Sequence, residues 1–190
     1  MKSRVIALSA ISAAFVALFL TLGAYIEFID IISVIVASVF IVLPMYENSK
    51  LGSFLAFLAG GVIAFLFSGM NIFTLVFPSY FLFFGVLPIV NRIAESKNFN
   101  KPLWFAIKFV WFAAVCVFLV FFYIEIMKMP IEFSFDIFGK DFDFSGINNI
   151  EIIFWIAFAV VAAVFFLVYN KFVQVSQIYV DKVLSRIIKK

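Results

Sequence analysis

The chain has 190 residues, of which 66% are hydrophobic and 13% are charged, and its mean hydropathy is +1.21. An ordinary globular domain is about 45–50% apolar and about 25% charged, so this chain has too few polar groups to cover a surface in water. The composition excludes a soluble globular protein and predicts an all-α integral membrane protein. The net charge of +3 is explained below by the topology and does not indicate a nucleic-acid partner.

Several kinds of functional site are excluded by the residue types that the chain lacks. It contains no histidine and a single cysteine, Cys116, which excludes an internal disulfide, a histidine proton relay and a zinc site built on histidine or several cysteines. No P-loop, dinucleotide-binding glycine motif or serine-nucleophile motif is present. We therefore expect a protein that is not an enzyme and that holds no cofactor and no metal.

Six apolar segments are candidates for helices across a hydrocarbon core of about 30 Å, which takes about 20 residues. They cover residues 5–26, 31–45, 51–67, 72–90, 104–124 and 150–169. The first is too long for the apolar core of a signal peptide, and no small-x-small cleavage site follows it, so we expect it to be retained as a span. In the fourth, Pro78 and Pro88 remove backbone donors and are expected to bend the helix, which is tolerated where neighbours replace the lost bonds.

The charged residues between these segments predict the orientation, because Lys and Arg are enriched in cytoplasmic connections. With the N-terminus inside, twelve of the 14 Lys and Arg residues are cytoplasmic: Lys2, Arg4, Lys50, Arg92, Lys97, Lys101, Lys108, Lys171, Lys182, Arg186, Lys189 and Lys190. Eight of the 11 acidic residues are then outside: Glu27, Asp30, Glu125, Glu132, Asp136, Asp141, Asp143 and Glu151. We predict six helices in one bundle with both termini cytoplasmic, in a bacterial inner membrane.

The loop at 125–149 contains a segment with a different period. Residues 132–144 alternate apolar and polar side chains around Gly139, Lys140 and Asp141, a pattern typical of a short β-hairpin. Residues 141–146 match the start of a calcium-binding EF-hand loop, but its twelfth position is Ile152 instead of Glu, so no metal site is predicted.

The tail at 170–190 is predicted to be an amphipathic helix that continues from the sixth span or turns away from it, and we divide the chain into a transmembrane domain, 1–169, and this tail. Its apolar stripe consists of Phe172, Val175, Tyr179, Val183 and Ile187, widened by Val180, Leu184 and Ile188. We expect the tail to lie along the inner membrane surface or against a partner, with its basic residues near anionic headgroups. The alternative is a straight extension of the sixth helix that packs under the bundle.

The first span has small residues at four-residue spacing, Ala10 with Ala14 and Ala13 with Ala17. Small residues on one face let another helix approach closely. That other helix belongs either to a partner protein or to the chain itself.

With six predicted helices, two cytoplasmic termini and the opening ALSAISAAFVALFLTLGAYI, the chain resembles the substrate-binding S component of energy-coupling factor (ECF) vitamin transporters. The segment FPSYFLFFGVLPIVNRIAE resembles a stretch of uncharacterised bacterial membrane proteins that are similar to S components. The resemblance implies that Ala10 and Ala14, with Ala13 and Ala17, contact a scaffold T component coupled to two ATPase subunits. It also implies a solute bound near the outer face, beneath the loops between helices.

Polar residues at the predicted outer helix ends are the candidates for solute binding: Tyr25, Glu27, Asp30, Asn71, Glu125, Asn148 and Trp155. An acidic outer cavity favours a cationic or amine-bearing solute, although the acids can also simply mark the non-cytoplasmic side. The sequence thus predicts a non-catalytic, solute-capturing subunit of an uptake transporter, energised by partner ATPases. The alternative is a structural scaffold of the cell-shape or division type without transport activity.

Overall fold

The computed structural model describes residues 3–71, 74–126, 128, 134–137, 140–143 and 150–188. The elements are α1 (Ser3–Tyr25), η1 (Glu27–Ile29), α2 (Asp30–Phe40), η2 (Leu43–Glu47), α3 (Lys50–Phe67), α4 (Val76–Ser79), η3 (Tyr80–Phe84), α5 (Val86–Ser96), α6 (Lys101–Phe121), η4 (Phe122–Ile126), β1 (Ser134–Ile137), β2 (Lys140–Asp143) and α7 (Ile150–Ile188). The short elements η1 and η2 are 3₁₀ helices, whereas η3 and η4 are π-helical segments that continue an α-helix.

Within the described residues, six helical stretches are long and apolar enough to cross a membrane, as the sequence predicts. They are Ser3–Tyr25, Asp30–Glu47, Lys50–Phe67, Val76–Ser96, Lys101–Ile126 and Ile150–Arg186. Their surfaces carry large apolar side chains that no other part of the described chain covers, among them Phe28, Val117 and Ile178. Such side chains are suited to contact with lipid, so the structure supports a multi-pass membrane protein.

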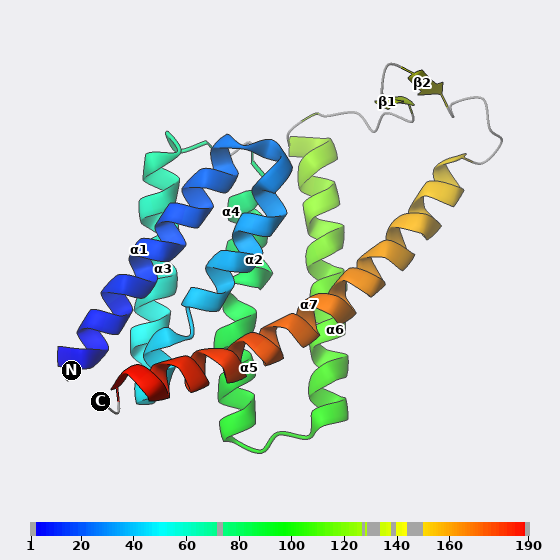
Figure 1. The fold of residues 1–190 in the computed structure, drawn as a ribbon. Helices are drawn as coiled ribbons and strands as arrows, with labels where there is room; N and C mark the ends of the chain where they lie inside the picture. The colour runs from blue at the N-terminus through cyan, green and yellow to red at the C-terminus, as the bar shows by residue number, and fades with distance from the viewer. Residues whose placement is uncertain are drawn as a thin grey trace.

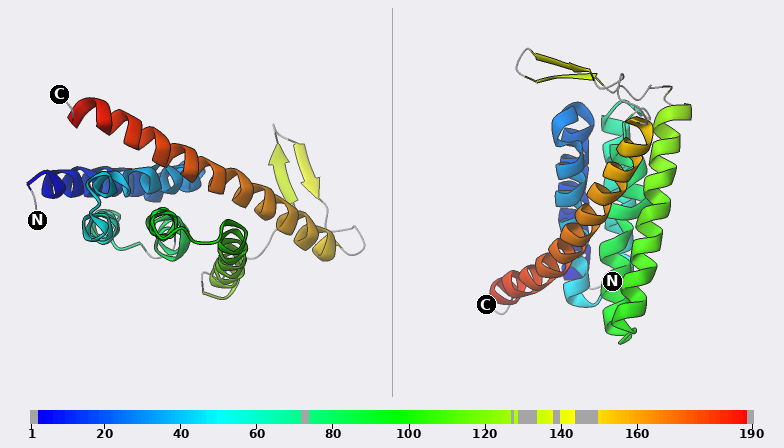
Figure 2. Two further views of the ribbon diagram at one scale, coloured as in Figure 1. Left: turned by 90° about the horizontal axis from the view of Figure 1, so that it is seen from below. Right: turned by 90° about the vertical axis from the view of Figure 1, so that its right-hand side faces the viewer.

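The helices form two layers (Figures 1 and 2). In the view from below in Figure 2, α3, α5 and α6 form a row seen nearly end-on, with α1, α2 and α7 lying across it. The N-terminus, the α2–α3 and α5–α6 connections and the C-terminal end of α7 gather at one end of the molecule (Figure 1). We call this the basic end, because Arg4, Lys50, Lys97, Lys101 and Arg186 belong to the helix ends that form it.

Close packing between α1 and its neighbours depends on glycines and serines. A methyl group added at Gly60 of α3 would lie 2.5 Å from Val16 of α1, and one added at Gly23 of α1 would lie 1.9 Å from the Ser33 hydroxyl of α2. The absence of side chains at these two positions therefore sets the distance between the helices, as expected for membrane helices that associate by van der Waals contact.

Two prolines leave helix carbonyls without their usual donors, and hydroxyl groups from neighbouring helices replace these donors. Pro88 has no N–H for the carbonyl of Phe84, which accepts a hydrogen bond from the Tyr169 hydroxyl of α7 at 3.1 Å. Pro44 likewise leaves the carbonyl of Phe40, which accepts from the Ser12 hydroxyl of α1 at 2.6 Å. The repair that we expected around Pro88 is present, and the helix there adopts the π-helical segment η3.

The predicted hairpin is present as β1 and β2, which pair antiparallel with Ser134 opposite Asp143 and Ile137 opposite Lys140. The predicted tail is helical and continues the sixth span without a break, since α7 is one helix of 39 residues. In this second half of α7 the apolar side chains Phe172, Val175 and Tyr179 are exposed, whereas Val173 and Gln177 face the protein and are buried. Four members of the predicted stripe, Phe172, Val175, Tyr179 and Val183, thus face outward and are free to contact lipid, whereas Leu184 is buried, and the side chains of Ile187 and Ile188 lie outside the described residues.

Candidate functional site

A lysine lies inside the apolar helix α6. Lys108 is the eighth residue of the stretch Lys101–Ile126, and its side chain is only 2% exposed. An ionisable group at such a position is costly, and in membrane proteins it usually faces the bundle interior and marks a functional site.

The Lys108 ammonium group is held by amide oxygens and an aromatic ring. Its Nζ donates to Oδ1 of Asn91 on α5 at 3.2 Å and to Oδ1 of Asn170 on α7 at 2.5 Å. It also lies 5.8 Å from the centre of the Trp104 ring, within the range of a cation–π interaction. These neighbours solvate the positive charge without neutralising it, because none of them is a carboxylate.

Further polar contacts join α7 to α5. Gln177 of α7 donates from Nε2 to the carbonyl oxygen of Pro88 at 2.9 Å, and Asp181 forms an ion pair with Arg92. Because Asn170, Gln177 and Asp181 are spaced at seven and four residues, they lie on one face of the helix. That face is polar and inward, which explains why the apolar stripe of the tail points outward.

A pocket of 670 Å³ lies between α5, α6 and α7, and we call it the α5–α6–α7 pocket. Its wall includes Asn91, Arg92, Glu95, Trp104, Lys108 and Gln177. This volume lies within the range of small-molecule sites, about 300–1,000 Å³.

Two buried polar atoms in the wall of this pocket have no hydrogen-bond partner within the described part of the chain. They are Nδ2 of Asn91, whose Oδ1 accepts from Trp104 at 2.9 Å and from Lys108, and Oε1 of Gln177. Asn91 is 2% exposed and Gln177 is 3% exposed. Buried polar groups are nearly always satisfied, so an unpaired donor and an unpaired acceptor at one pocket indicate that a ligand or water completes it.

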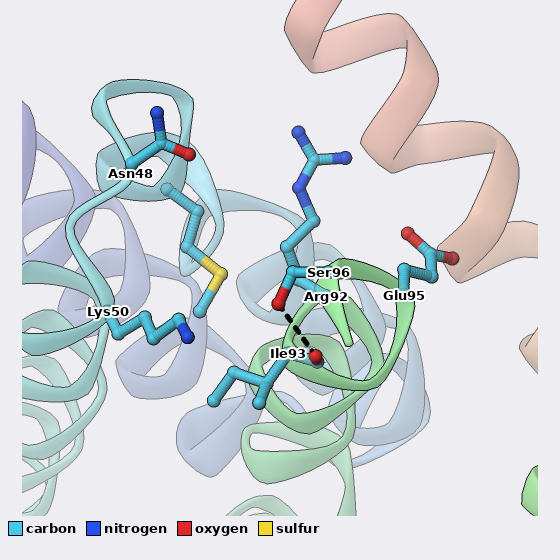
Figure 3. Close-up of a pocket in the computed structure, with 7 residues that line it drawn as sticks. Asn48, Lys50, Arg92, Ile93, Glu95 and Ser96 are labelled. Carbon is cyan, nitrogen blue, oxygen red and sulfur yellow. Dashed lines mark hydrogen bonds between the residues drawn. The ribbon is translucent and has the colours of Figure 1, made fainter. Parts of the chain in front are cut away.

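A second pocket, of 480 Å³, lies beside the first and shares Arg92 and Glu95 with it. Lys50 reaches this second pocket from the start of α3, while Arg92 and Glu95 project from α5 (Figure 3). The backbone turns into α3 through Asn48, which has a positive φ of 55°. Together the two pockets form a region at the basic end in which the cationic side chains outnumber the one carboxylate among the described lining residues, Glu95.

Aromatic side chains pack next to the polar network, on the side away from the basic end. Phe83 of η3 lies 5.0 Å from Phe112 and 6.0 Å from Tyr169, measured between ring centres, and Phe112 lies 5.4 Å from Phe166. Phe83, Phe166 and Tyr169 are at most 2% exposed. Phe112 is four residues, about one turn of α6, further from the basic end than Lys108, so this aromatic layer adjoins the polar network on that side.

Tyr25, Asp30 and Glu125 belong to the ends of α1, α2 and the α6–η4 helix that lie opposite the basic end (Figure 1). The Tyr25 hydroxyl donates to the carbonyl of Phe67 at 2.8 Å, which joins the ends of α1 and α3. Asp30 begins α2 and accepts from its neighbour's backbone N–H, and Glu125 pairs with Lys128 at 3.2 Å.

The other outer candidates are placed as follows. Asn71 is exposed directly after α3. Trp155 of α7 borders an apolar pocket of 410 Å³ that also contains Cys116. Asn148 and the side chain of Glu27 lie outside the described residues. Solute binding by this set of residues remains a prediction.

The four alanines of α1 that are predicted to contact a partner, Ala10, Ala13, Ala14 and Ala17, fall on different sides of the helix. Ala10 and Ala14 are exposed, whereas Ala17 is buried and the carbonyl of Ala13 lies against Gly60 of α3. Ala13 and Ala17 therefore belong to packing within the chain. Ala10 and Ala14 form an exposed surface of small residues, and its contact with a partner remains a prediction.

The sequence analysis counted Lys108 only as a marker of the cytoplasmic side. Its place inside the predicted span 104–124 was the signal available for finding it. Asn170 and Gln177 could not be assigned to it from the sequence, because they are 62 and 69 residues further along the chain.

Comparisons with family models, with curated proteins and with solved structures find no match to this chain. The resemblance to S components therefore remains a prediction.

Proposed function

We propose that the chain is a non-catalytic membrane subunit that binds a small solute and delivers it to the cytoplasm, similar to the S component of an ECF transporter. The observation that carries the proposal is the α5–α6–α7 pocket, in which a buried ammonium group and two unpaired amide atoms meet inside a bundle of apolar helices. A buried charge with unpaired polar neighbours lowers the folding stability, and a role in solute binding would explain why the protein contains such a site.

The position of the pocket supports a role in transport. It lies at the basic end, which the distribution of Lys and Arg assigns to the cytoplasm. The aromatic layer around Phe83 and Phe166 lies between it and the other end. A transporter needs such a barrier between the two sides of its site, and in this proposal the inner pocket holds the solute on the cytoplasmic side of the barrier.

The exposed surface at Ala10 and Ala14 supports the participation of a partner. Two small residues one turn apart on an exposed face permit a foreign helix to approach α1 closely. We assign this surface to a T-type scaffold subunit, which would connect the solute-binding chain to its ATPases.

The proposal is tested by gentle purification of the tagged full-length chain, followed by native mass spectrometry for a retained small molecule. We expect the wild type to retain a solute and Lys108→Met to lose it. Lys97→Met is the matched control, because Lys97 is exposed at the same end and does not line either pocket. Equal retention by Lys108→Met would contradict this assignment of the site, and retention of no solute by the wild type would favour the structural scaffold.

Partner binding is tested separately by co-purification with T-type and ATPase subunits. Replacing Ala10 and Ala14 by Leu should abolish the association, whereas Ala59→Leu, on the exposed face of α3, should preserve it. Association that survives in both variants would contradict the role of the α1 surface.

A further inference from the structure

The polar region at the basic end has a definite charge. Four cationic residues border the two adjoining pockets: Lys50, Arg92, Lys101 and Lys108. Glu95 borders both pockets, and Asp181 is paired with Arg92. The formal charge of the described residues in this region is therefore +2, and its deepest cation, Lys108, donates hydrogen bonds to the neutral amides Asn91 and Asn170.

The unpaired atoms define what kind of group fits. Asn91 Nδ2 is a donor without an acceptor, and it belongs to the same amide whose oxygen binds Lys108. An anionic oxygen placed there would accept from both the amide and the ammonium group. Gln177 Oε1 is an acceptor without a donor, so the same ligand needs a hydroxyl group close to its anionic oxygens.

We propose that the α5–α6–α7 pocket binds a phosphate ester of a polyol, with the phosphate oxygens at Lys108 and Asn91 and a hydroxyl group donating to Gln177. A phosphate monoester carries a charge of about −1.5 to −2 near neutral pH, which matches the formal +2 of the region better than the single charge of a carboxylate. The 670 Å³ pocket exceeds what a bare phosphate ion fills. This inference rests on the proposed function in that it names the class of solute.

Two sources supply this chemistry, a soluble phosphorylated polyol and the headgroup of phosphatidylglycerol. Both present a phosphate ester beside free hydroxyl groups, but only the soluble monoester carries the charge that matches the region, because the phosphate of phosphatidylglycerol is a diester with a single negative charge. They differ in the acyl chains, for which the exposed apolar face at Phe105 and Ile178, which also border the pocket, offers a path.

The test uses the full-length protein in nanodiscs of phosphatidylcholine, titrated with glycerol 3-phosphate and followed by calorimetry. Glycerol and lactate serve as comparison ligands that lack the phosphate. In parallel, protein in nanodiscs with phosphatidylglycerol is released and examined by native mass spectrometry for retained lipid. Binding of glycerol 3-phosphate supports the soluble source, and selective retention of phosphatidylglycerol supports the lipid source.

Asn91→Asp is the decisive variant. It places a carboxylate against Lys108, which preserves a partner for the buried charge while removing the donor and adding repulsion toward an anion. We expect its affinity for the phosphate ligand to fall at least tenfold, and Lys108→Met to behave similarly, because hydrogen bonds to charged groups account for tenfold effects or more. Lys97→Met should bind as the wild type does.

The proposal is overturned if the wild type binds neither phosphate ligand, if lactate binds as tightly as glycerol 3-phosphate, or if Asn91→Asp keeps full affinity. Failure of the proposed function is distinguishable from this. A retained neutral or cationic solute would refute the phosphate site while supporting solute capture. Phosphate binding by a chain that associates with no transport partner would support the phosphate site while refuting the proposed function.

Discussion

The first three helices and the last three bury different kinds of polar group. Between α1, α2 and α3 the buried polar side chains are serines, including Ser12, Ser33 and Ser53, and the helices approach closely at glycines. Between α5, α6 and α7 the buried groups are three amides and an amine, Asn91, Asn170, Gln177 and Lys108, and a pocket separates the helices. The Ser33 hydroxyl donates to the carbonyl of Asp30 in its own helix, whereas Lys108 and Gln177 bond to groups on other helices. The comparison supports the proposal that the second half carries the binding site and that the closely packed first half supports it.

The largest expected effect lies in the first half. Gly60→Val should reduce the free energy of unfolding by about 3 kcal/mol, because the new side chain would overlap Val16 and force α1 away from α3. The measurement is an SDS titration in mixed micelles. Ala59→Val, on the exposed face of the same helix, should change the stability little. Equal stability of the two variants would show that α1 and α3 are not closely packed.

A smaller loss of stability, with a loss of binding, is expected in the second half. Asn170→Leu removes the closer of the two amide oxygens that hold Lys108, and should cost about 2 kcal/mol, since it leaves a buried charge partly unpaired. Lys171→Leu, an exposed neighbour, should be tolerated. Unlike Gly60→Val, Asn170→Leu should also reduce solute retention in the folded fraction, and an effect on stability alone would contradict the division of roles.

A contact within the second half, between α7 and the fourth span, can be tested by a double-mutant cycle. Tyr169→Phe removes the hydroxyl that donates to the carbonyl of Phe84. We expect it to lower the free energy of unfolding by about 1 kcal/mol, within the range found for hydrogen bonds between membrane helices. Pro88→Ala restores a backbone N–H at this point. In the Pro88→Ala background, Tyr169→Phe should lower the free energy of unfolding by clearly less. If the effects of the two substitutions on this free energy simply add, the hydroxyl does not replace the missing donor.

The smallest effect is expected from the hydroxyl that serves the other proline. Ser12→Ala removes the donor to the carbonyl of Phe40, freed by Pro44, and should cost about 0.6 kcal/mol. Ser9→Ala is the matched control, because the Ser9 hydroxyl bonds only to the carbonyl of Val5 in its own helix. The free energy of unfolding of Ser9→Ala should stay within measurement error of the wild-type value.

The helices could be predicted from the sequence because each depends on local composition. The six spans follow from apolar runs, the hairpin from an alternating pattern, and the helical tail from a period near 3.6. The sequence could not predict which face of the tail packs against the bundle. The contacts of Gln177 and Asp181 with α5, which decide it, join residues that are far apart in the sequence. In lipid, the polar face is the one that turns inward.

The pocket could not be predicted for a related reason. Lys108, Asn91 and Asn170 belong to three helices, and the contacts among them span 17 and 62 residues of sequence. Nothing in local periodicity specifies which residues of separate helices meet. The sequence instead drew attention to the acidic helix ends, where charge is concentrated but where the described residues mostly form local contacts, as Glu125 does with Lys128.

The unbroken course of α7 has a mechanical consequence. A straight helix of 39 residues is about 58 Å long, nearly twice the thickness of a hydrocarbon core of about 30 Å. It therefore lies obliquely across the bundle, as Figure 1 shows. Its first turn adjoins the loop that carries the hairpin, and its second half holds Asn170 and Gln177 against the pocket. Because the helix is continuous, a displacement imposed on its first turn by a docking molecule would be transmitted along the helix to Asn170, whose amide oxygen binds Lys108.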